Sequence, residues 1–140
     1  MRKLLSLVLC MIPISAYCDV ESESLCFESS VGGKIKYELR TYSDVSANWF
    51  GGFVRYEKSK QPISLVLKSV EREELDPQAP AQLTRTWSEV LDGQITGEYE
   101  MVSQGGNIVS MIYKKKSGKE YSFSFDPTVE VSAEGGCEWK

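Results

Sequence analysis

Hydrophobic and polar side chains alternate with a period of two along most of this chain, and short turn-forming segments interrupt the alternation. Between residues 34 and 42, Ile35, Tyr37 and Leu39 share one face, whereas Lys36, Glu38 and Arg40 share the other. Such alternation is typical of a β-strand with one buried and one exposed face, because successive side chains point to opposite sides. No segment combines a helical repeat with helix caps. The pattern therefore predicts an all-β protein.

Eight alternating segments are long enough to form strands. Their expected bounds are residues 25–29, 34–42, 49–57, 63–70, 83–91, 94–103, 108–116 and 119–126. Short turns join most of these segments, so consecutive strands are expected to pair as antiparallel neighbours. Such a meander either closes into a small up-and-down barrel or folds into a two-sheet sandwich. The barrel is favoured, because closure leaves no exposed strand edge.

Two residue pairs that contain glycine predict local geometry. Asp92-Gly93 separates two alternating segments and fits a type I′ hairpin turn, in which both central residues have positive φ. Gly51-Gly52 lies inside an expected strand. Glycine at such a position indicates a bulge, a bend or the close approach of another backbone.

The first eighteen residues have the composition of an export signal. Arg2 and Lys3 precede an apolar stretch, and small residues follow it. We therefore expect residues 1–18 to be a bacterial secretion signal peptide and the mature protein to be periplasmic or secreted. The apolar stretch is shorter than the roughly 20 residues of a transmembrane helix, so a membrane-spanning anchor is not expected.

The remaining residues 19–140 are expected to form a single β domain, because their number suits one domain and no linker divides them. An alternative to cleavage after Cys18 makes this cysteine the lipid-bearing first residue of a lipoprotein. The bulky Tyr17 in front of it disfavours lipidation.

The cysteines support cleavage after residue 18. Of the four cysteines, Cys10 and Cys18 lie in the expected signal, which leaves Cys26 and Cys137 near the two ends of the mature chain. This even pair is expected to form a disulfide in an oxidising compartment. Closing a loop of ~100 residues stabilises a fold by at most about 4.7 kcal/mol in the chain-entropy estimate.

The charge of the expected mature chain is acidic. Without Arg2 and Lys3, the chain contains fourteen basic and twenty acidic residues, which gives a net charge of about −6. An acidic surface argues against nucleic acid as a partner, since phosphates require a basic footprint. It suits a cationic partner, and it also suits solubility alone.

The chain contains no histidine. Catalytic triads, Cys-His pairs and histidine-ligated zinc sites are therefore excluded. The nearest acid pair, Glu98 and Glu100, is expected on an exposed strand face, where carboxylates normally provide solvation. No spacing matches a calcium-binding loop. We expect a protein that is not an enzyme and that has no metal site and no cofactor.

Two sets of residues are candidates for partner binding. Trp49 and Phe50 directly precede the double glycine, and aromatic side chains at a rim commonly contact a ligand or a partner protein. The penultimate expected strand is apolar on both faces, and Val109, Met111 and Tyr113 share one of them. A strand of this kind is either covered on both sides or exposes a patch where a partner docks.

In size, expected export, disulfide and β content, the chain resembles the small envelope proteins that inhibit lysozymes. This resemblance concerns general architecture, and what it implies is a protein partner at most. Our first hypothesis is accordingly an exported binding protein of the bacterial envelope. It would recognise a protein or peptide partner, cationic in character, through aromatic rim residues and an acidic surface.

The second hypothesis is a carrier of a small apolar ligand, which requires space inside a barrel. The interior is expected around Tyr37, Trp87, Tyr99 and Phe123. A filled interior would favour surface recognition, and a cavity of about 300 Å³ or more would favour the carrier.

Overall fold

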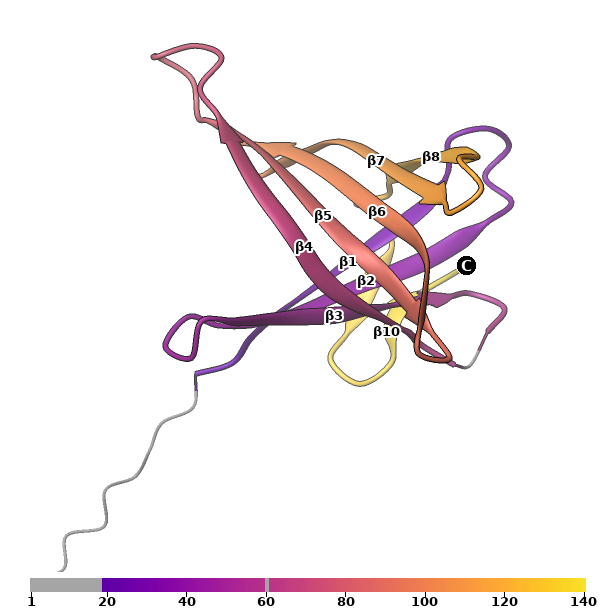
Figure 1. Ribbon diagram of the computed structural model, residues 1–140. Helices are drawn as coiled ribbons and strands as arrows, with labels where there is room; N and C mark the ends of the chain where they lie inside the picture. The colour runs from indigo at the N-terminus through magenta and orange to yellow at the C-terminus, as the bar shows by residue number, and fades with distance from the viewer. Residues whose placement is uncertain (1–18, 60) are drawn as a thin grey trace, which may run out of the picture.

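The structure is a computed structural model that describes residues 19–59 and 61–140. The expected signal segment, with Cys10 and Cys18, lies outside the described residues. Within the described part, eight strands form a closed antiparallel barrel and two short strands form a separate hairpin (Figure 1). The barrel strands are β1 (Glu21–Ser29), β2 (Lys36–Asp44), β3 (Trp49–Tyr56), β4 (Ile63–Glu73), β5 (Gln82–Leu91), β6 (Gln94–Gln104), β7 (Asn107–Lys115) and β8 (Glu120–Phe125), and the hairpin strands are β9 (Glu130–Ser132) and β10 (Gly136–Glu138).

Each barrel strand pairs with its sequence neighbours, and β1 also pairs with β8, which closes the barrel. The prediction of an up-and-down barrel is thus confirmed, and the two-sheet alternative is not adopted. The predicted turn between β5 and β6 is also present. Asp92 and Gly93 have φ angles of 50° and 73°, as a type I′ turn requires. The strand bounds differ most at β1, which begins at Glu21 and not at Leu25.

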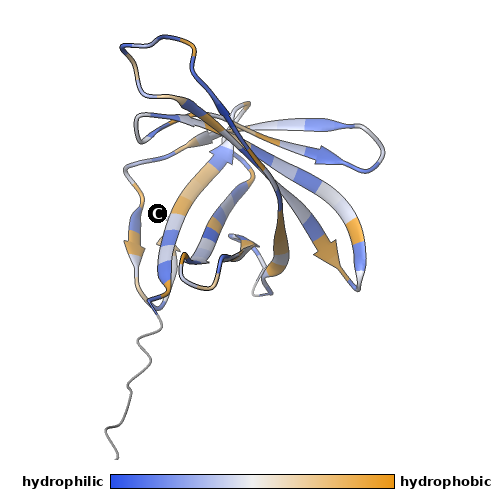
Figure 2. Ribbon diagram, turned by 60° about the vertical axis from the view of Figure 1, so that its left-hand side comes forward, coloured by the Kyte–Doolittle hydropathy of each residue, from blue (hydrophilic) through white to orange (hydrophobic). Residues whose placement is uncertain are grey.

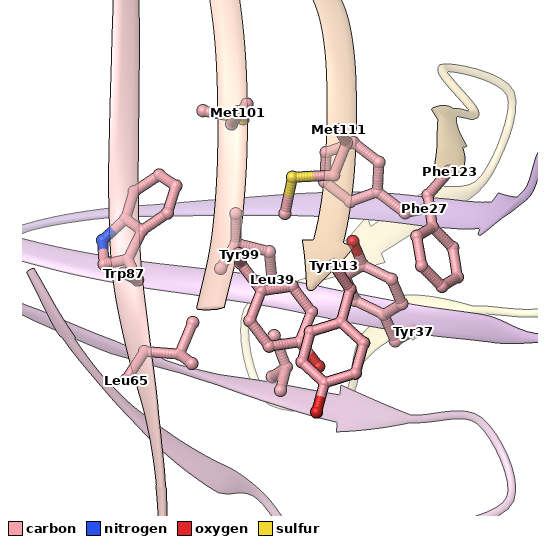
Figure 3. Close-up of a cluster of buried hydrophobic side chains, with 11 residues drawn as sticks. Phe27, Tyr37, Leu39, Leu65, Trp87, Tyr99, Met101, Met111, Tyr113 and Phe123 are labelled. Atoms are coloured by element: carbon pink, nitrogen blue, oxygen red, sulfur yellow. The ribbon is translucent and has the colours of Figure 1, made fainter. Parts of the chain in front are cut away.

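Alternation along the strands directs one set of apolar side chains into the barrel, and Figure 2 shows it as short blue and orange blocks along the strands. The buried core consists of Phe27, Tyr37, Leu39, Val54, Leu65, Trp87, Tyr99, Met101, Met111, Tyr113 and Phe123. In Figure 3 these side chains extend from facing strands toward a shared interior. The inward orientation predicted for Tyr37 and Leu39 is confirmed, since both are fully buried. The same prediction is wrong for Ile35, which precedes β2 and is 44% exposed. Burying one such side chain contributes about 1.5–3 kcal/mol.

The barrel is open at one end, because β3 and β4 pair over only part of their length. Residues 51–54 pair with residues 63–66. Beyond this point β4 continues to Glu73 with β5 as its partner, and the first residues of β3 pair with β2. Figure 1 shows β4 and β5 running away from β3 toward this end. We call it the open end, and the end with the β5–β6 and β7–β8 turns the closed end.

The predicted disulfide is formed. Cys26 on β1 and Cys137 on β10 are joined, with their Cα atoms 5.9 Å apart and a sequence separation of 111. The bond fastens the C-terminal hairpin to the first strand, as expected. A disulfide suggests an oxidising, extracytoplasmic compartment, because cytosolic thiols are kept reduced.

A buried ion pair also holds the hairpin on the barrel. Glu38 on β2 is 1% exposed and accepts hydrogen bonds from Arg40 and Arg55 at 2.8 and 2.6 Å. Arg55 also donates to the carbonyl oxygen of Gly135, next to β10. The buried carboxylate of Glu38 is therefore paired with two guanidinium groups. Burial of this carboxylate without a partner would be strongly unfavourable.

Gly51-Gly52 marks a close approach of two backbones. The β2–β3 pairing runs through both residues without a register shift, so no bulge is present there. A Cβ atom at residue 52 would collide with the carbonyl oxygen of Arg40 on β2. The sequence left open a bulge, a bend or the close approach of another backbone, and the structure shows the close approach.

Candidate functional site

Aromatic side chains fill the half of the interior toward the closed end. The ring of Tyr37 lies 5.4 Å from Phe27, 5.5 Å from Tyr56 and 4.8 Å from Phe123, measured between centroids. These separations are those of directly packed aromatic pairs. The closed half is therefore a plug of stacked and edge-to-face rings.

A buried carboxylate lies within this plug. Glu89 on β5 is 5% exposed and accepts hydrogen bonds from the hydroxyls of Thr96, Tyr99 and Tyr113 at 2.6, 3.1 and 2.8 Å. The Tyr99 hydroxyl also lies 2.6 Å from that of Tyr56. Burial raises the pKa of both Tyr99 and Tyr113, so at neutral pH these hydroxyls keep the protons that they donate. The network satisfies a charge that would be costly to bury alone.

The half of the interior toward the open end contains a cavity of about 340 Å³. Its apolar wall consists of Leu25, Leu39, Leu67, Val70, Trp87 and Met101. Trp87 and Met101 are each 3% exposed and line the cavity. In Figure 3 both lie on the side of the core away from Phe123. Small-molecule pockets in proteins usually measure about 300–1,000 Å³, so this cavity is large enough for a small ligand.

A few polar groups interrupt the apolar wall. Arg85 on β5 and Glu23 on β1 are the charged residues that line the cavity, and Thr41 and Ser43 on β2 add hydroxyls. Arg85 is half-buried, whereas Glu23 is exposed. An apolar wall with a small number of polar groups is the usual make-up of a ligand site, in which the polar groups fix the orientation of the ligand.

The inward-facing residues of β5 extend from the aromatic plug to the cavity. Glu89 contacts the tyrosines of the plug, Trp87 separates plug from cavity, and Arg85 lines the cavity wall. These residues alternate along one strand face, with about 7 Å between successive members. Sequence reasoning did not select Arg85 or Glu89 as candidates. The spacing from Trp87 is the signal that would have placed both of them inside.

Trp49 and Phe50 lie at the open end, where β3 begins. Phe50 lines the cavity and is 45% exposed, whereas Trp49 is 51% exposed. The Trp49 ring lies against Gly51, so close that a Cβ atom there would be 2.8 Å from it. The structure therefore places Phe50 at the mouth of the cavity and Trp49 next to it, against Gly51 and outside the cavity lining.

The other predicted set, Val109, Met111 and Tyr113, does not share one face. Met111 and Tyr113 are 1% and 9% exposed and belong to the core, whereas Val109 is 58% exposed. The β6–β7 pairing shifts register between Val102 and Ser103, and the resulting β-bulge changes which residues of β7 point inward. The expectation of a common face, and of a docking patch made by all three residues, is wrong for this physical reason.

A second hollow, of about 480 Å³, lies at the closed end beside the β1–β2 turn. Its lining includes Val31, which is 91% exposed, and Ile35, which is 44% exposed. It is therefore a shallow depression on the surface, outside the aromatic plug. The cavity at the open end is the better candidate site, because the core residues Leu39, Trp87 and Met101 form part of its wall.

The described ranges, 19–59 and 61–140, contain neither a membrane-spanning helix nor a metal-binding cluster of side chains. In these ranges no helix has the length and apolar character needed to cross a membrane. The same residues contain no cluster of three or more His, Cys, Asp or Glu side chains arranged to hold a metal ion. Comparison of the chain with protein-family models, curated proteins and solved structures gives no match.

Proposed function

We propose that this protein is an exported, non-enzymatic binding protein that holds a small apolar ligand in the open half of its barrel. One observation carries the proposal: a cavity of about 340 Å³ with a mainly apolar wall lies at the open end of a barrel whose other end is packed with aromatic rings. Protein interiors normally pack as densely as organic crystals. The cavity also exceeds the size of about 300 Å³ that we take as favouring a carrier.

Titration with an uncharged apolar fluorophore, N-phenyl-naphthylamine, tests this proposal. We expect saturable binding with enhanced fluorescence, because the probe leaves water for the apolar wall. Leu67→Trp places a larger side chain in the cavity wall, and we expect it to weaken binding by about tenfold, or 1.4 kcal/mol. The absence of saturable binding to the wild type would contradict the proposal.

Val66→Trp is the matched control for this experiment. Val66 is the neighbour of Leu67 on β4 but lies outside the cavity and is 54% exposed. The same substitution there should leave the affinity unchanged. Thermal unfolding of both variants shows whether each retains the fold, and equal affinities of two folded variants would place the binding elsewhere.

The location that we propose is the periplasm or the exterior of a bacterial cell. The disulfide between Cys26 and Cys137 supports export, because such bonds persist in oxidising compartments. Mass determination of the natural N-terminus tests it. A chain that begins at Asp19 agrees with cleavage after residue 18, a diacylglyceryl group on Cys18 identifies a lipoprotein, and an intact cytosolic chain refutes export.

A second candidate function is recognition of a protein or peptide partner, cationic in character, at the rim of the open end. Val45, Trp49 and Phe50 are 75%, 51% and 45% exposed there. Exposed apolar side chains gathered at one place often mark an interaction site, and the acidic charge of the chain suits a basic partner.

Lysozyme is the first protein partner to test. The envelope inhibitors that the chain resembles in architecture use a Ser-Gly-x-x-Tyr loop element. Ser117 and Gly118 of the β7–β8 turn and Tyr121 at the start of β8 have this spacing. We expect the wild type to inhibit lysozyme and Tyr121→Ala to lose the inhibition. Tyr42→Ala, which removes a tyrosine from β2, is the control and should inhibit normally. A wild type without effect on lysozyme would rule out this partner.

A further inference from the structure

Arg85 is a charge inside an otherwise largely apolar cavity. It lies on β5 between Leu83 and Trp87, on the strand face that points into the barrel, and it pairs with Met101 of β6 and Val70 of β4 across the sheet. Met101, Val70 and Trp87 all belong to the cavity wall. The guanidinium therefore projects from the apolar wall and not from the outer surface.

Arg85 has no carboxylate partner among the described residues. Its one hydrogen bond there joins Nη1 to the Ser103 hydroxyl at 3.4 Å. Arg40 and Arg55, by contrast, both bind Glu38 within 2.8 Å. A guanidinium stays charged at every physiological pH, and a half-buried charge without a counter-charge is unfavourable. The remaining donors of Arg85 are free to bind an anion from outside the chain.

We propose that the ligand of this cavity is a single-chain amphiphile whose anionic headgroup binds Arg85. Its apolar chain would pack on Leu39, Trp87 and Met101. The inference rests on the proposed carrier function and adds the chemical class of the ligand. A carboxylate or a phosphate accepts two parallel hydrogen bonds from one guanidinium, which gives strength and fixed orientation. Both headgroups share this chemistry, and the experiment separates them.

Glu23 is the other charged residue of the cavity wall. It lies on β1, is exposed, and repels an anion in the same cavity. Water screens this repulsion more strongly than the attraction of the half-buried Arg85. Replacement of Glu23 by Gln should therefore strengthen binding of an anionic ligand and leave binding of a neutral ligand unchanged.

Calorimetric titrations with dodecanoate, dodecyl phosphate and dodecanol, each below its micellar concentration, test the inference. We expect the wild type to bind one or both anions at least tenfold more tightly than the alcohol, and the tighter anion identifies the headgroup. Arg85→Gln should remove this preference by weakening the anions alone. Arg85→Lys keeps the positive charge but lacks the planar guanidinium with its two parallel donors, so it should retain part of the preference.

Arg72→Gln is the matched control, since Arg72 lies near the same end on β4 but is 65% exposed and paired with Glu74. It should bind like the wild type. If neither anion binds the wild type more tightly than the alcohol, or if folded Arg85→Gln keeps the preference, the inference is wrong and the carrier proposal stands. If neither the three compounds nor the neutral fluorophore binds, the anionic-ligand inference and the carrier proposal are both wrong. Urea unfolding of each variant establishes that it is folded.

Discussion

The hydroxyl of Tyr113 on β7 donates a hydrogen bond to Oε1 of Glu89 on β5 at 2.8 Å, across the intervening strand β6. Gly97 of β6 makes this contact possible, because a Cβ atom there would lie 2.6 Å from the hydroxyl. The residues at positions 89, 97 and 113 therefore depend on one another. Together they fix the aromatic plug, which leaves the empty space of the barrel at the opposite end.

Replacement of Tyr113 by Phe should destabilise the barrel by about 1.5–3 kcal/mol. The substitution removes one donor from a buried carboxylate, and hydrogen bonds to charged groups contribute about this much. Equilibrium unfolding in urea measures the change, with an unaltered slope as evidence that both proteins unfold in the same way.

Tyr121→Phe is the matched control for Tyr113→Phe. Tyr121 lies directly opposite Tyr113 in the β7–β8 pairing, but its hydroxyl does not reach Glu89. The same change there should alter the free energy of unfolding by no more than about 0.5 kcal/mol. Equal effects at the two positions would show that the bond to Glu89 contributes nothing measurable.

Alkaline titration should separate the tyrosines into two groups. Lys119 holds the pKa of Tyr121 below its ordinary value, whereas burial raises the pKa of Tyr37, Tyr56 and Tyr99. The unfolded chain ionises its tyrosines near pH ~10. It therefore loses protons that the native state keeps, and stability falls as the pH rises above about 10.

Tyrosinate absorbance and circular dichroism, followed together against pH, measure this behaviour. We expect an early absorbance step in the folded protein, absent in Tyr121→Phe, and a later step that coincides with unfolding. Ionisation of all tyrosines in one step while the barrel is still folded would contradict the assignment.

Much of the fold followed from the sequence, because alternation reports directly which face of a strand is buried. Tyr37 and Leu39 were placed inside by this pattern alone, and Asp92-Gly93 defined its turn through the φ angles that these residues tolerate. The faces of β7 could not be predicted. The bulge opposite Val102 and Ser103 adds one residue, and nothing in the local composition marks it.

The site was only partly predictable for a different reason. A cavity depends on how side-chain volumes from all strands add up, and periodicity contains no volumes. Alternation does place Arg85 and Glu89 on the same inward face of β5 as Trp87. Which of them finds partners depends on tertiary contacts: Glu89 meets three hydroxyls, whereas Arg85 faces the apolar wall.

Alanine substitutions at Gly51 and Gly52 should have unequal effects although the residues are adjacent. A Cβ atom at residue 52 collides with the backbone carbonyl of Arg40, which cannot move without opening the β2–β3 pairing. At residue 51 it meets the ring of Trp49, a half-exposed side chain that can rotate away.

We therefore expect Gly52→Ala to cost at least about 1–3 kcal/mol, as overpacking does in a closely packed region. Gly51→Ala should cost less than about 1 kcal/mol and should change the tryptophan fluorescence, because Trp49 is displaced. Urea unfolding followed by circular dichroism measures the first quantity, and emission spectra of the folded proteins measure the second. A larger loss of stability at residue 51 would refute the assigned contacts.

The C-terminal hairpin allows a similar test at Gly136. This residue has a φ of 76°, and a Cβ atom on it would collide with the carboxylate of Glu38 and the guanidinium of Arg55. Alanine at this position therefore adds backbone strain of about 1–2 kcal/mol and also disturbs a buried ion pair. Breaking such a pair costs about 3–5 kcal/mol, so Gly136→Ala should destabilise the protein by more than strain alone.

Gly106→Ala measures the strain by itself. Gly106, in the β6–β7 turn, has a similar φ of 85°, and nothing lies within 4 Å of the position that a Cβ atom would occupy. We expect about 1–2 kcal/mol from this substitution and a distinctly larger value from Gly136→Ala, both from urea unfolding with the disulfide intact. Equal values would mean that the hairpin shifts to accommodate the methyl group, and that the ion pair of Glu38 does not fix its position on the barrel.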